Sequence, residues 1–316
     1  MNKKLYEMLQ WPQWTLDPDQ GLQPVPAGSK AVLVTKIHTL EKRETDIPAR
    51  IRYRGVSRKF LAGHFRADLE EYLYKSLFYI GQKGCAFREQ TVTRLNSCDN
   101  EMLNDIFDEI ASNAGPTAPP KTFFEKFFTN PTNRVRFIEM VDDDLDVRDY
   151  YLSYLHKIGS KRVSSFFLSS SSDLEVAHGF AEGIEAEPRE LLCYIYADPL
   201  PELGRGRILS IDPQDETYRR FIKEKLKARK LPHCNWPYEK ESETMIMAGI
   251  MPHLLWCIAD LTNRKLIVHP QLFCTPLKTL YLNIDQSNFD EELAKRTYYI
   301  SSFTRARNQI SENAKN

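Results

Sequence analysis

Residues 236–249 read WPYEKESETMIMAG, a stretch that turns from charged to apolar at Thr244. Residues 244–247 indicate the core of a β-strand. If the strand extends back to Glu241, alternate side chains share one face, so Glu241 and Glu243 point the same way. Their Cα atoms would then lie roughly 6.5 Å apart. Two carboxylates at such a separation can form an acid/base pair or stabilise a sugar cation. The alternative is the solvated edge of a strand.

Length and charge limit the classes to which this chain can belong. Its 316 residues are enough for a substantial core, in one large domain or two small ones. Lys and Arg total 43, and Asp and Glu total 43, so the formal net charge is zero. Dedicated nucleic-acid binders usually carry a basic excess, so neutrality counts against that class. A local basic groove is still compatible with it, and the candidate cations are Lys223, Lys225, Lys227, Arg229 and Lys230. A solvated helix face is the other interpretation of that cluster.

The cysteine and hydropathy patterns favour a cytoplasmic protein. The 6 cysteines show no Cys-x-x-Cys spacing, which indicates free thiols in a reducing compartment. His233-Cys234 has no second ligand pair near it in the sequence, so we expect no metal. The N-terminal residues lack the long apolar core of a signal peptide. The sequence contains no apolar run of about 18 residues, so we expect no membrane span.

The chain is predicted to be of the α+β class, with helices early and mostly antiparallel strands late. Residues 1–30 indicate an irregular arm, 31–285 the main domain, and 286–316 a C-terminal helix and tail. Within the main domain, 62–160 is expected to be largely helical. Apolar or alternating segments predict strands at 31–34, 50–56, 164–169, 191–197, 207–211, 254–259, 265–269 and 277–284. Helical spacing predicts helices at 121–157, 173–180 and 214–230.

Three separated segments together carry a pattern that resembles one known family. They are Tyr53-Arg54-Gly55, residues 167–180 (FLSSSSDLEVAHGF), and Glu241-Ser242-Glu243 with Gly249 behind it. In order and spacing they resemble the Arg–Ser–Glu class of the mono-ADP-ribosyltransferase superfamily. That class combines an aromatic-Arg-Gly strand, a Ser-Thr-Ser strand with a downstream Ala-x-x-Phe helix, and a Glu-x-Glu motif. The resemblance implies a catalytic domain over 31–285, with two packed, mostly antiparallel sheets and the helical region inserted in the first half.

The resemblance implies that NAD+ is bound as a substrate, without a metal. Cleavage of its N-glycosidic bond builds oxocarbenium character on the ribose, which a nearby carboxylate stabilises. Glu243 would be that carboxylate and would bond the ribose 2′-hydroxyl, while Ser169 orients it. Arg54 would donate to the pyrophosphate or the ribose. The remaining NAD+ contacts would come from Gly55, Ser171 and Phe180.

Two further roles follow from the resemblance. The backbone of Gly55 would approach the nicotinamide carboxamide, because no side chain intervenes. On the acceptor side, Glu241 would steer and deprotonate an arginine. A guanidinium, with its pKa above about 12, is a poor nucleophile, so it needs a base beside it. Trp236 and Tyr238, just ahead in the sequence, would contact the acceptor.

Two departures from the family pattern bear on function. Ser170 stands where the family usually has threonine, and this change keeps a hydroxyl at that position. The span from 213 to 241 is longer than usual and is predicted to contain a helix, so it should affect the choice of target.

The function expected from the resemblance is transfer of ADP-ribose to an arginine of a target protein. The enzyme would be cytoplasmic, or a bacterial toxin or effector delivered into a host cell. An NAD glycohydrolase, which uses water as acceptor, and an enzyme that modifies a nucleic-acid base are alternatives. A degenerate transferase fold that serves as a binding module is a third. The target protein, any activating partner and the oligomeric state stay open.

Overall fold

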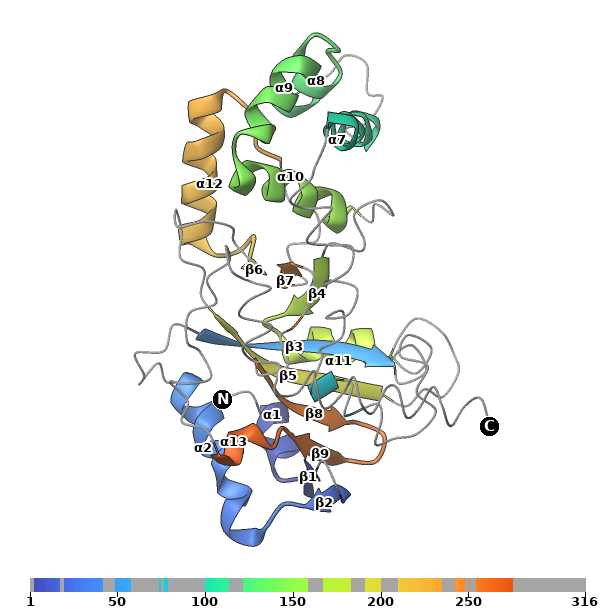
Figure 1. The fold of residues 1–316 in the computed structure, drawn as a ribbon, viewed down its shortest axis with the longest axis vertical. Helices are drawn as coiled ribbons and strands as arrows, with labels where there is room; N and C mark the ends of the chain where they lie inside the picture. The colour runs from blue at the N-terminus through green and yellow to red at the C-terminus, as the bar shows by residue number, and fades with distance from the viewer. Residues whose placement is uncertain are drawn as a thin grey trace, which may run out of the picture. The chain divides into compact units, whose positions relative to one another are not determined.

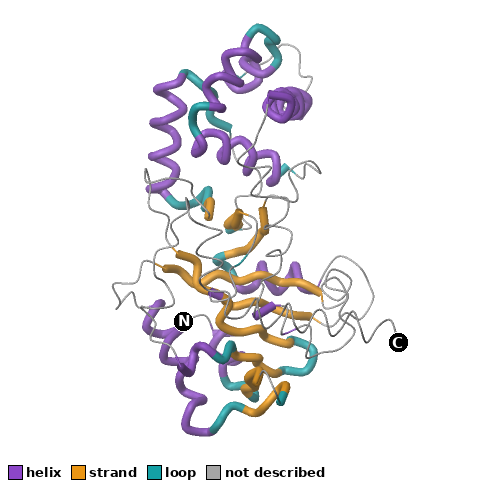
Figure 2. The backbone as a smooth tube through the Cα atoms, in the orientation of Figure 1, coloured by secondary structure: helices purple, strands orange, loops and turns teal. Residues whose placement is uncertain are grey.

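In the computed structural model the chain forms two compact units, each built from separate parts of the sequence (Figure 1). The sheet unit comprises residues 1–85, 169–200 and 249–316, and the helical unit comprises 86–168 and 201–248. The structure describes residues 3–17, 20–41, 49–57, 74, 77–78, 100–113, 122–158, 167–182, 191–199, 210–234, 242–247, 250 and 254–274. Helices and strands are both present, which confirms the mixed α+β class (Figure 2). Within the described residues, no helix is long and apolar enough to cross a membrane.

The strands of the sheet unit pair in the order β2-β1-β9-β8-β5-β3-β4. Their bounds are Gln13–Asp17 (β1), Gly21–Pro24 (β2), Ala49–Ser57 (β3), Phe167–Ser171 (β4), Leu191–Pro199 (β5), Leu255–Asp260 (β8) and Lys265–Val268 (β9). Of β4, residues 169–171 belong to this unit. Neighbouring strands are antiparallel except β1 and β9, which are parallel. The strands predicted at 50–56, 191–197, 254–259 and 265–269 are confirmed, and the one predicted at 164–169 falls on β4 from Phe167. Residues 277–284 lie outside the described part of the chain.

The helices of the sheet unit supply much of its core. They are α1 (Lys3–Leu9), α2 (Lys30–Glu41), α11 (Leu174–Glu182) and α13 (Gln271–Cys274), with a short 3-10 turn, η1 (Ala27–Ser29). Buried side chains of α1, α2, α11 and α13 form one hydrophobic cluster with strand residues, Trp256 among them. The helix predicted at 173–180 is confirmed in α11.

Two predictions for the N-terminal part are wrong. Residues 31–34 lie in α2, not in a strand, because Leu33, Ile37 and Leu40 are buried at helical spacing. Residues 1–30 are not an irregular arm, since they contain α1, η1 and the hairpin of β1 and β2. The pairing of β1 with β9 joins segments far apart in the sequence, as in the bond from Thr15 to the carbonyl of Val268. Local composition cannot reveal such a pairing.

The helical unit contains the remaining described elements. They are α7 (Asn100–Asn113), α8 (Phe123–Phe128), α9 (Asn133–Asp142), α10 (Leu145–Lys157), α12 (Glu216–Arg229), β6 (Ser210–Ile211) and β7 (Glu243–Met247). Strands β6 and β7 pair antiparallel. The predicted helices at 121–157 and 214–230, and the predicted strand at 244–247, are confirmed. The helical unit is not confined to the predicted helical region 62–160, because it also takes in 201–248.

Aromatic side chains form the centre of the helical unit. Phe107, Phe128, Phe137 and Tyr151 come from four different helices, and their neighbouring ring centroids lie 5.0 to 5.8 Å apart. The rings meet edge-on or tilted, which is the favoured geometry for aromatic pairs. Helix α10 is central to this core, since nearly all its side chains are buried.

The start of α10 is fixed to α12 by a cluster of charges. Asp144 caps α10 by accepting hydrogen bonds from the backbone N–H groups of Asp146 and Val147, at 3.0 and 3.3 Å. The same carboxylate pairs with Lys225 at 3.1 Å and with Arg229 at 2.6 Å, both on α12. The two helices are therefore held in register by a buried aspartate.

Candidate active site

In the sheet unit, Arg54 and Ser169 meet. Arg54 lies in the middle of β3 and donates a hydrogen bond from Nη1 to the carbonyl oxygen of Ser169 on β4. The two residues are 115 positions apart in the sequence. The arginine and serine motifs, predicted to belong to one site, are thus brought together on neighbouring strands.

Gly55 is packed tightly against α11. A Cβ atom at this position would lie 2.6 Å from the backbone nitrogen of Ala181 and closer still to the carbonyl oxygen of Ala177. Tyr53, two residues earlier, is buried in the same cluster as Ala177. Because side chains alternate along a strand, Arg54 points to the opposite face of β3 from α11. The glycine therefore has a packing role in addition to the ligand contact expected for it.

The serines of β4 have different surroundings. Ser171 is buried, and its hydroxyl accepts a hydrogen bond from the backbone N–H of Asp173 at 3.0 Å. Asp173 in turn accepts from the backbone N–H of Glu175 at 2.8 Å, so this turn opens α11. Ser169 is only partly buried. Of the two serines predicted to contact NAD+, Ser171 already helps to shape the turn into the helix.

The Ala-x-x-Phe segment divides between the core and the surface. Ala177 is buried against β3, whereas the side chain of Phe180 is 61 % exposed. Both lie on α11. The alanine explains how the helix approaches the strand so closely, and the phenylalanine is available at the surface for a ligand.

In the helical unit, the carboxylate of Glu243 is bound by the end of α10. Lys157 Nζ donates to Oε2 of Glu243 at 2.9 Å, and His156 Nε2 lies 3.8 Å from Oε1. The side chains of Lys157, Glu243 and His156 are 3 %, 12 % and 13 % exposed. The ring of His156 also packs beside that of Phe167, with centroids 5.5 Å apart. The nearly buried carboxylate of Glu243 is thus paired with a cation, as a charge removed from water requires.

The backbone just before Glu243 is not extended. Strand β7 begins at Glu243, and Ser242 has a φ of 48°, in the left-handed region that serine adopts rarely. The strand therefore begins at Glu243 and does not extend back through Ser242. The prediction that Glu241 shares a strand face with Glu243 falls on a residue that the structure does not describe. Glu241, Trp236 and Tyr238 lie outside the described residues.

Sequence analysis missed Lys157 and His156. The available signal is helical spacing: Tyr150, Tyr154 and Lys157 recur at i, i+4 and i+7, and two of them are core aromatics. A lysine on the apolar stripe of a helix needs a buried partner, since lysine is almost never buried unpaired. The sequence does not show that this partner is Glu243.

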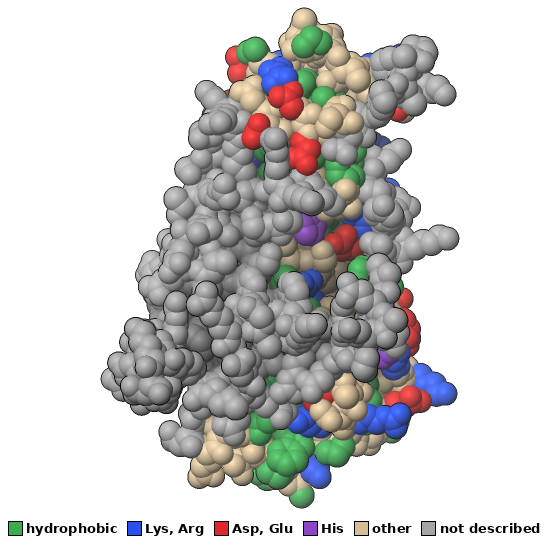
Figure 3. All heavy atoms as spheres, turned by 90° about the vertical axis from the view of Figure 1, so that its right-hand side faces the viewer, with side chains coloured by type: hydrophobic (Ala, Val, Ile, Leu, Met, Phe, Trp, Pro, Cys, Tyr) green, Lys and Arg blue, Asp and Glu red, His purple; other side chains and the backbone are tan. Residues whose placement is uncertain are grey.

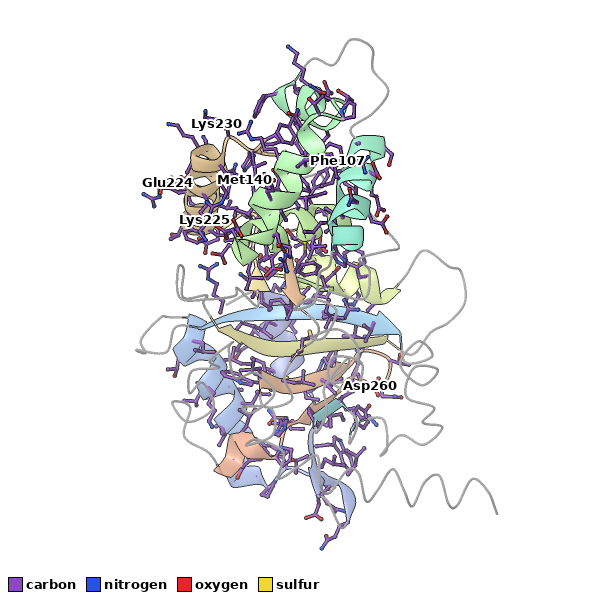
Figure 4. All side chains as sticks on the ribbon, turned by 45° about the horizontal axis from the view of Figure 1, so that its top comes forward. Phe107, Met140, Glu224, Lys225, Lys230 and Asp260 are labelled. Carbon is purple, nitrogen blue, oxygen red and sulfur yellow. The ribbon has the colours of Figure 1, made fainter. Side chains whose placement is uncertain are left out.

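The basic cluster considered for nucleic acid is divided between two faces of α12. Lys225 and Arg229 turn inward to Asp144, whereas Lys223, Lys227 and Lys230 are exposed. Glu224 and Lys230 project from the outer side of this helix (Figure 4). On the face drawn in Figure 3, described acidic and basic side chains are interspersed. Lys225 and Arg229, two of the five cations, are therefore engaged by Asp144 and do not line a basic groove.

His233 and Cys234 take part in packing. Cys234 Sγ lies 2.7 Å from the hydroxyl of Tyr150, and burial raises the pKa of the thiol to about 12. Burial, followed by the nearby charges of Lys223 and Arg219, lowers the pKa of His233. Among the described residues, no three His, Cys, Asp or Glu side chains are grouped as metal ligands.

Comparisons of the chain with protein-family models, with curated proteins and with solved structures find no match.

Proposed function

We propose that the chain is a mono-ADP-ribosyltransferase that cleaves NAD+ and transfers ADP-ribose to an arginine of a target protein. The observation that carries the proposal is the hydrogen bond from Arg54 to the carbonyl of Ser169. The arginine motif and the serine motif, which the sequence linked only by resemblance to a family, are in contact in the structure. The proposal includes the finer fold assignment, an ADP-ribosyltransferase-like core to which the helical region has been added.

The geometry supports the NAD+ part of the reaction. Arg54 offers a planar fork of donors, part of which is already fixed by a backbone carbonyl, and such a fork suits a pyrophosphate. Glu243 offers a nearly buried carboxylate, the group required beside a ribose that becomes cationic. In a site of low dielectric, that attraction is stronger than in water.

The acceptor part of the proposal rests on Glu241 beside Glu243 in sequence. Arginine needs a base because its guanidinium is protonated at neutral pH. Ser242, between the two glutamates, has a positive φ, and β7 begins only at Glu243. The proposal assigns Glu243 to the ribose and Glu241 to the acceptor. Cytoplasmic action, as a resident enzyme or a delivered toxin or effector, belongs to the same proposal.

The test uses NAD+ labelled in the adenylate, incubated with the protein and a cell lysate. Wild type is compared with Glu243→Gln, Glu241→Gln and, as a matched control, Glu224→Gln on the exposed side of α12. We expect wild type and Glu224→Gln to label a protein band that protease removes and nuclease does not. Glu243→Gln should release nicotinamide about 10²–10³-fold more slowly, the usual cost of losing an electrostatic stabiliser.

Different outcomes point to different acceptors. Glu241→Gln should lose transfer while it still releases nicotinamide. Label sensitive to nuclease would indicate a nucleic-acid acceptor, and nicotinamide release without label would indicate a glycohydrolase. No binding or cleavage of NAD+ by folded wild-type protein would contradict the proposal and leave the binding module. Because Glu243→Gln leaves the Lys157 ammonium without its carboxylate, the melting temperature of each variant is recorded first.

A further inference from the structure

Lys157 is a buried lysine, and a buried lysine requires a charged or polar partner. It is the last residue of α10, and its side chain is 3 % exposed. An ammonium taken out of water costs several kcal/mol unless a partner offsets the loss. The carboxylate of Glu243, at 2.9 Å, is that partner. The distance is typical of a charge-assisted hydrogen bond.

The two carboxylate oxygens of Glu243 have different contacts. Oε2 accepts from Lys157, whereas Oε1 has His156 Nε2 at 3.8 Å, beyond hydrogen-bonding distance. Among the described residues, Oε1 therefore has a neighbour but no hydrogen bond. A carboxylate fixed through one oxygen presents the other in a defined direction.

The helix that carries Lys157 is itself fixed. Its first turn is capped by Asp144, which pairs with Lys225 and Arg229 of α12. Farther along, the hydroxyl of Tyr151 donates to the carbonyl of Pro232 at 2.7 Å. A rigid support is what a positioning residue requires, because small displacements of a reacting group lower the rate strongly.

We propose that Lys157 is a positioning residue, which holds Oε2 of Glu243 so that Oε1 faces the ribose hydroxyl of NAD+. This inference rests on the proposed function. Lys157 does not touch substrate in this role and acts only through Glu243. The inserted helical region then contributes directly to the reaction, besides any part in choosing the target.

The test measures nicotinamide release over a range of NAD+ concentrations, on protein shown to be folded at the assay temperature. Lys157→Met keeps most of the length of the side chain and removes the charge. Lys157→Arg keeps the charge and changes its shape. Lys223→Met, an exposed lysine on α12, is the matched control and should behave as wild type. We expect Lys157→Met to lower kcat by about 10²-fold, the scale of a misplaced reacting group, with little change in KM.

Partial recovery separates positioning from simple folding. Lys157→Arg should give a kcat between those of wild type and Lys157→Met. If Lys157 had only a structural role, Lys157→Met would melt at a lower temperature but, while folded, would keep the wild-type kcat; that result overturns the proposal. If Lys157→Met does not fold, Lys157→Arg decides: a reduced kcat at unchanged KM supports positioning, and a wild-type kcat overturns it.

Failure of the proposed function has a different signature. In that case wild-type protein releases no more nicotinamide than Glu243→Gln. Failure of the positioning role alone would leave wild type and Lys157→Met equally active while Glu243→Gln is slow.

Discussion

Replacement of Gly55 by alanine is expected to force α11 away from β3. The added Cβ would meet backbone atoms, with Ala181 N at 2.6 Å and Ala177 C at 2.8 Å. Non-bonded heavy atoms normally approach to about 3.5 Å, so these two contacts require a movement of roughly 1 Å. The carbonyl oxygen of Ala177, which would lie closer still, requires more. Helix backbone cannot give way as the tip of a side chain can. The buried contacts of Ala177 and Leu174 would loosen with that movement.

The size of the effect follows from two opposing terms. Overpacking that shifts the backbone costs about 3 kcal/mol, at the upper end of the usual range. Gly55 lies in an extended strand, so alanine also gains up to about 1 kcal/mol by restricting the unfolded chain. The net loss is about 2 kcal/mol in the free energy of unfolding. For a folding unit of this size, such a loss lowers the melting temperature by roughly 4–8 °C.

Thermal unfolding followed by circular dichroism would measure this loss. The matched control is Gly179→Ala on α11, where an added Cβ meets nothing within 4 Å. That variant should be stabilised by about 0.5–1 kcal/mol, because glycine is unfavourable within a helix. A Gly55→Ala protein that melts within about 1 °C of wild type would refute the packing argument and leave the ligand as the reason for the glycine.

Three further predictions concern stability. Lys230 follows α12 with a φ of 53°, so Lys230→Gly should raise the free energy of unfolding by about 0.5–1 kcal/mol in urea titrations. In the same titrations, Asp144→Ala should lower the free energy of unfolding by about 2–4 kcal/mol, because the cap and the ion pairs are lost. The control Asp143→Ala, at an exposed position, should change it by less than about 0.5 kcal/mol. Burial lowers the pKa of His269 from 6.5 to about 4. Between those pH values the unfolded chain binds a proton that the folded chain does not, so the free energy of unfolding falls as the pH falls. Melting curves from pH 7 to pH 4 should show a loss of about 3 kcal/mol that His269→Gln abolishes and His38→Gln keeps.

Periodicity in the sequence was enough to find most described elements of the core. Helix α12 follows its amphipathic pattern closely, because one face is buried. Strand β3 was found from its alternation, although both Arg52 and Tyr53, on opposite faces, are buried. It failed for α2, where the short apolar run 31–34 hid a longer helical stripe. It also failed for β1, whose partner β9 comes from the far end of the described chain. Pairings over such separations depend on tertiary packing rather than local preference.

The sequence motifs also indicated which residues of the candidate site to examine. The motifs identified Arg54 and Ser169, which the structure brings into contact, and Glu243, which it places at the start of β7. The left-handed backbone of Ser242 could not be foreseen, since serine gives no sign of positive φ as glycine does. Tertiary structure alone supplies this kind of detail.

Helix α10 joins these observations into one argument about the inserted region. Its first turn is bound by charges to α12, and its last residue binds the carboxylate proposed to stabilise the ribose. A shortened chain that lacks 62–160 would leave Glu243 without the cation that offsets its burial. Removal of this region should therefore abolish NAD+ cleavage, and not only the recognition of a target. A helical region devoted to target choice alone could be deleted without loss of nicotinamide release, and the ion pair between Lys157 and Glu243 argues against that.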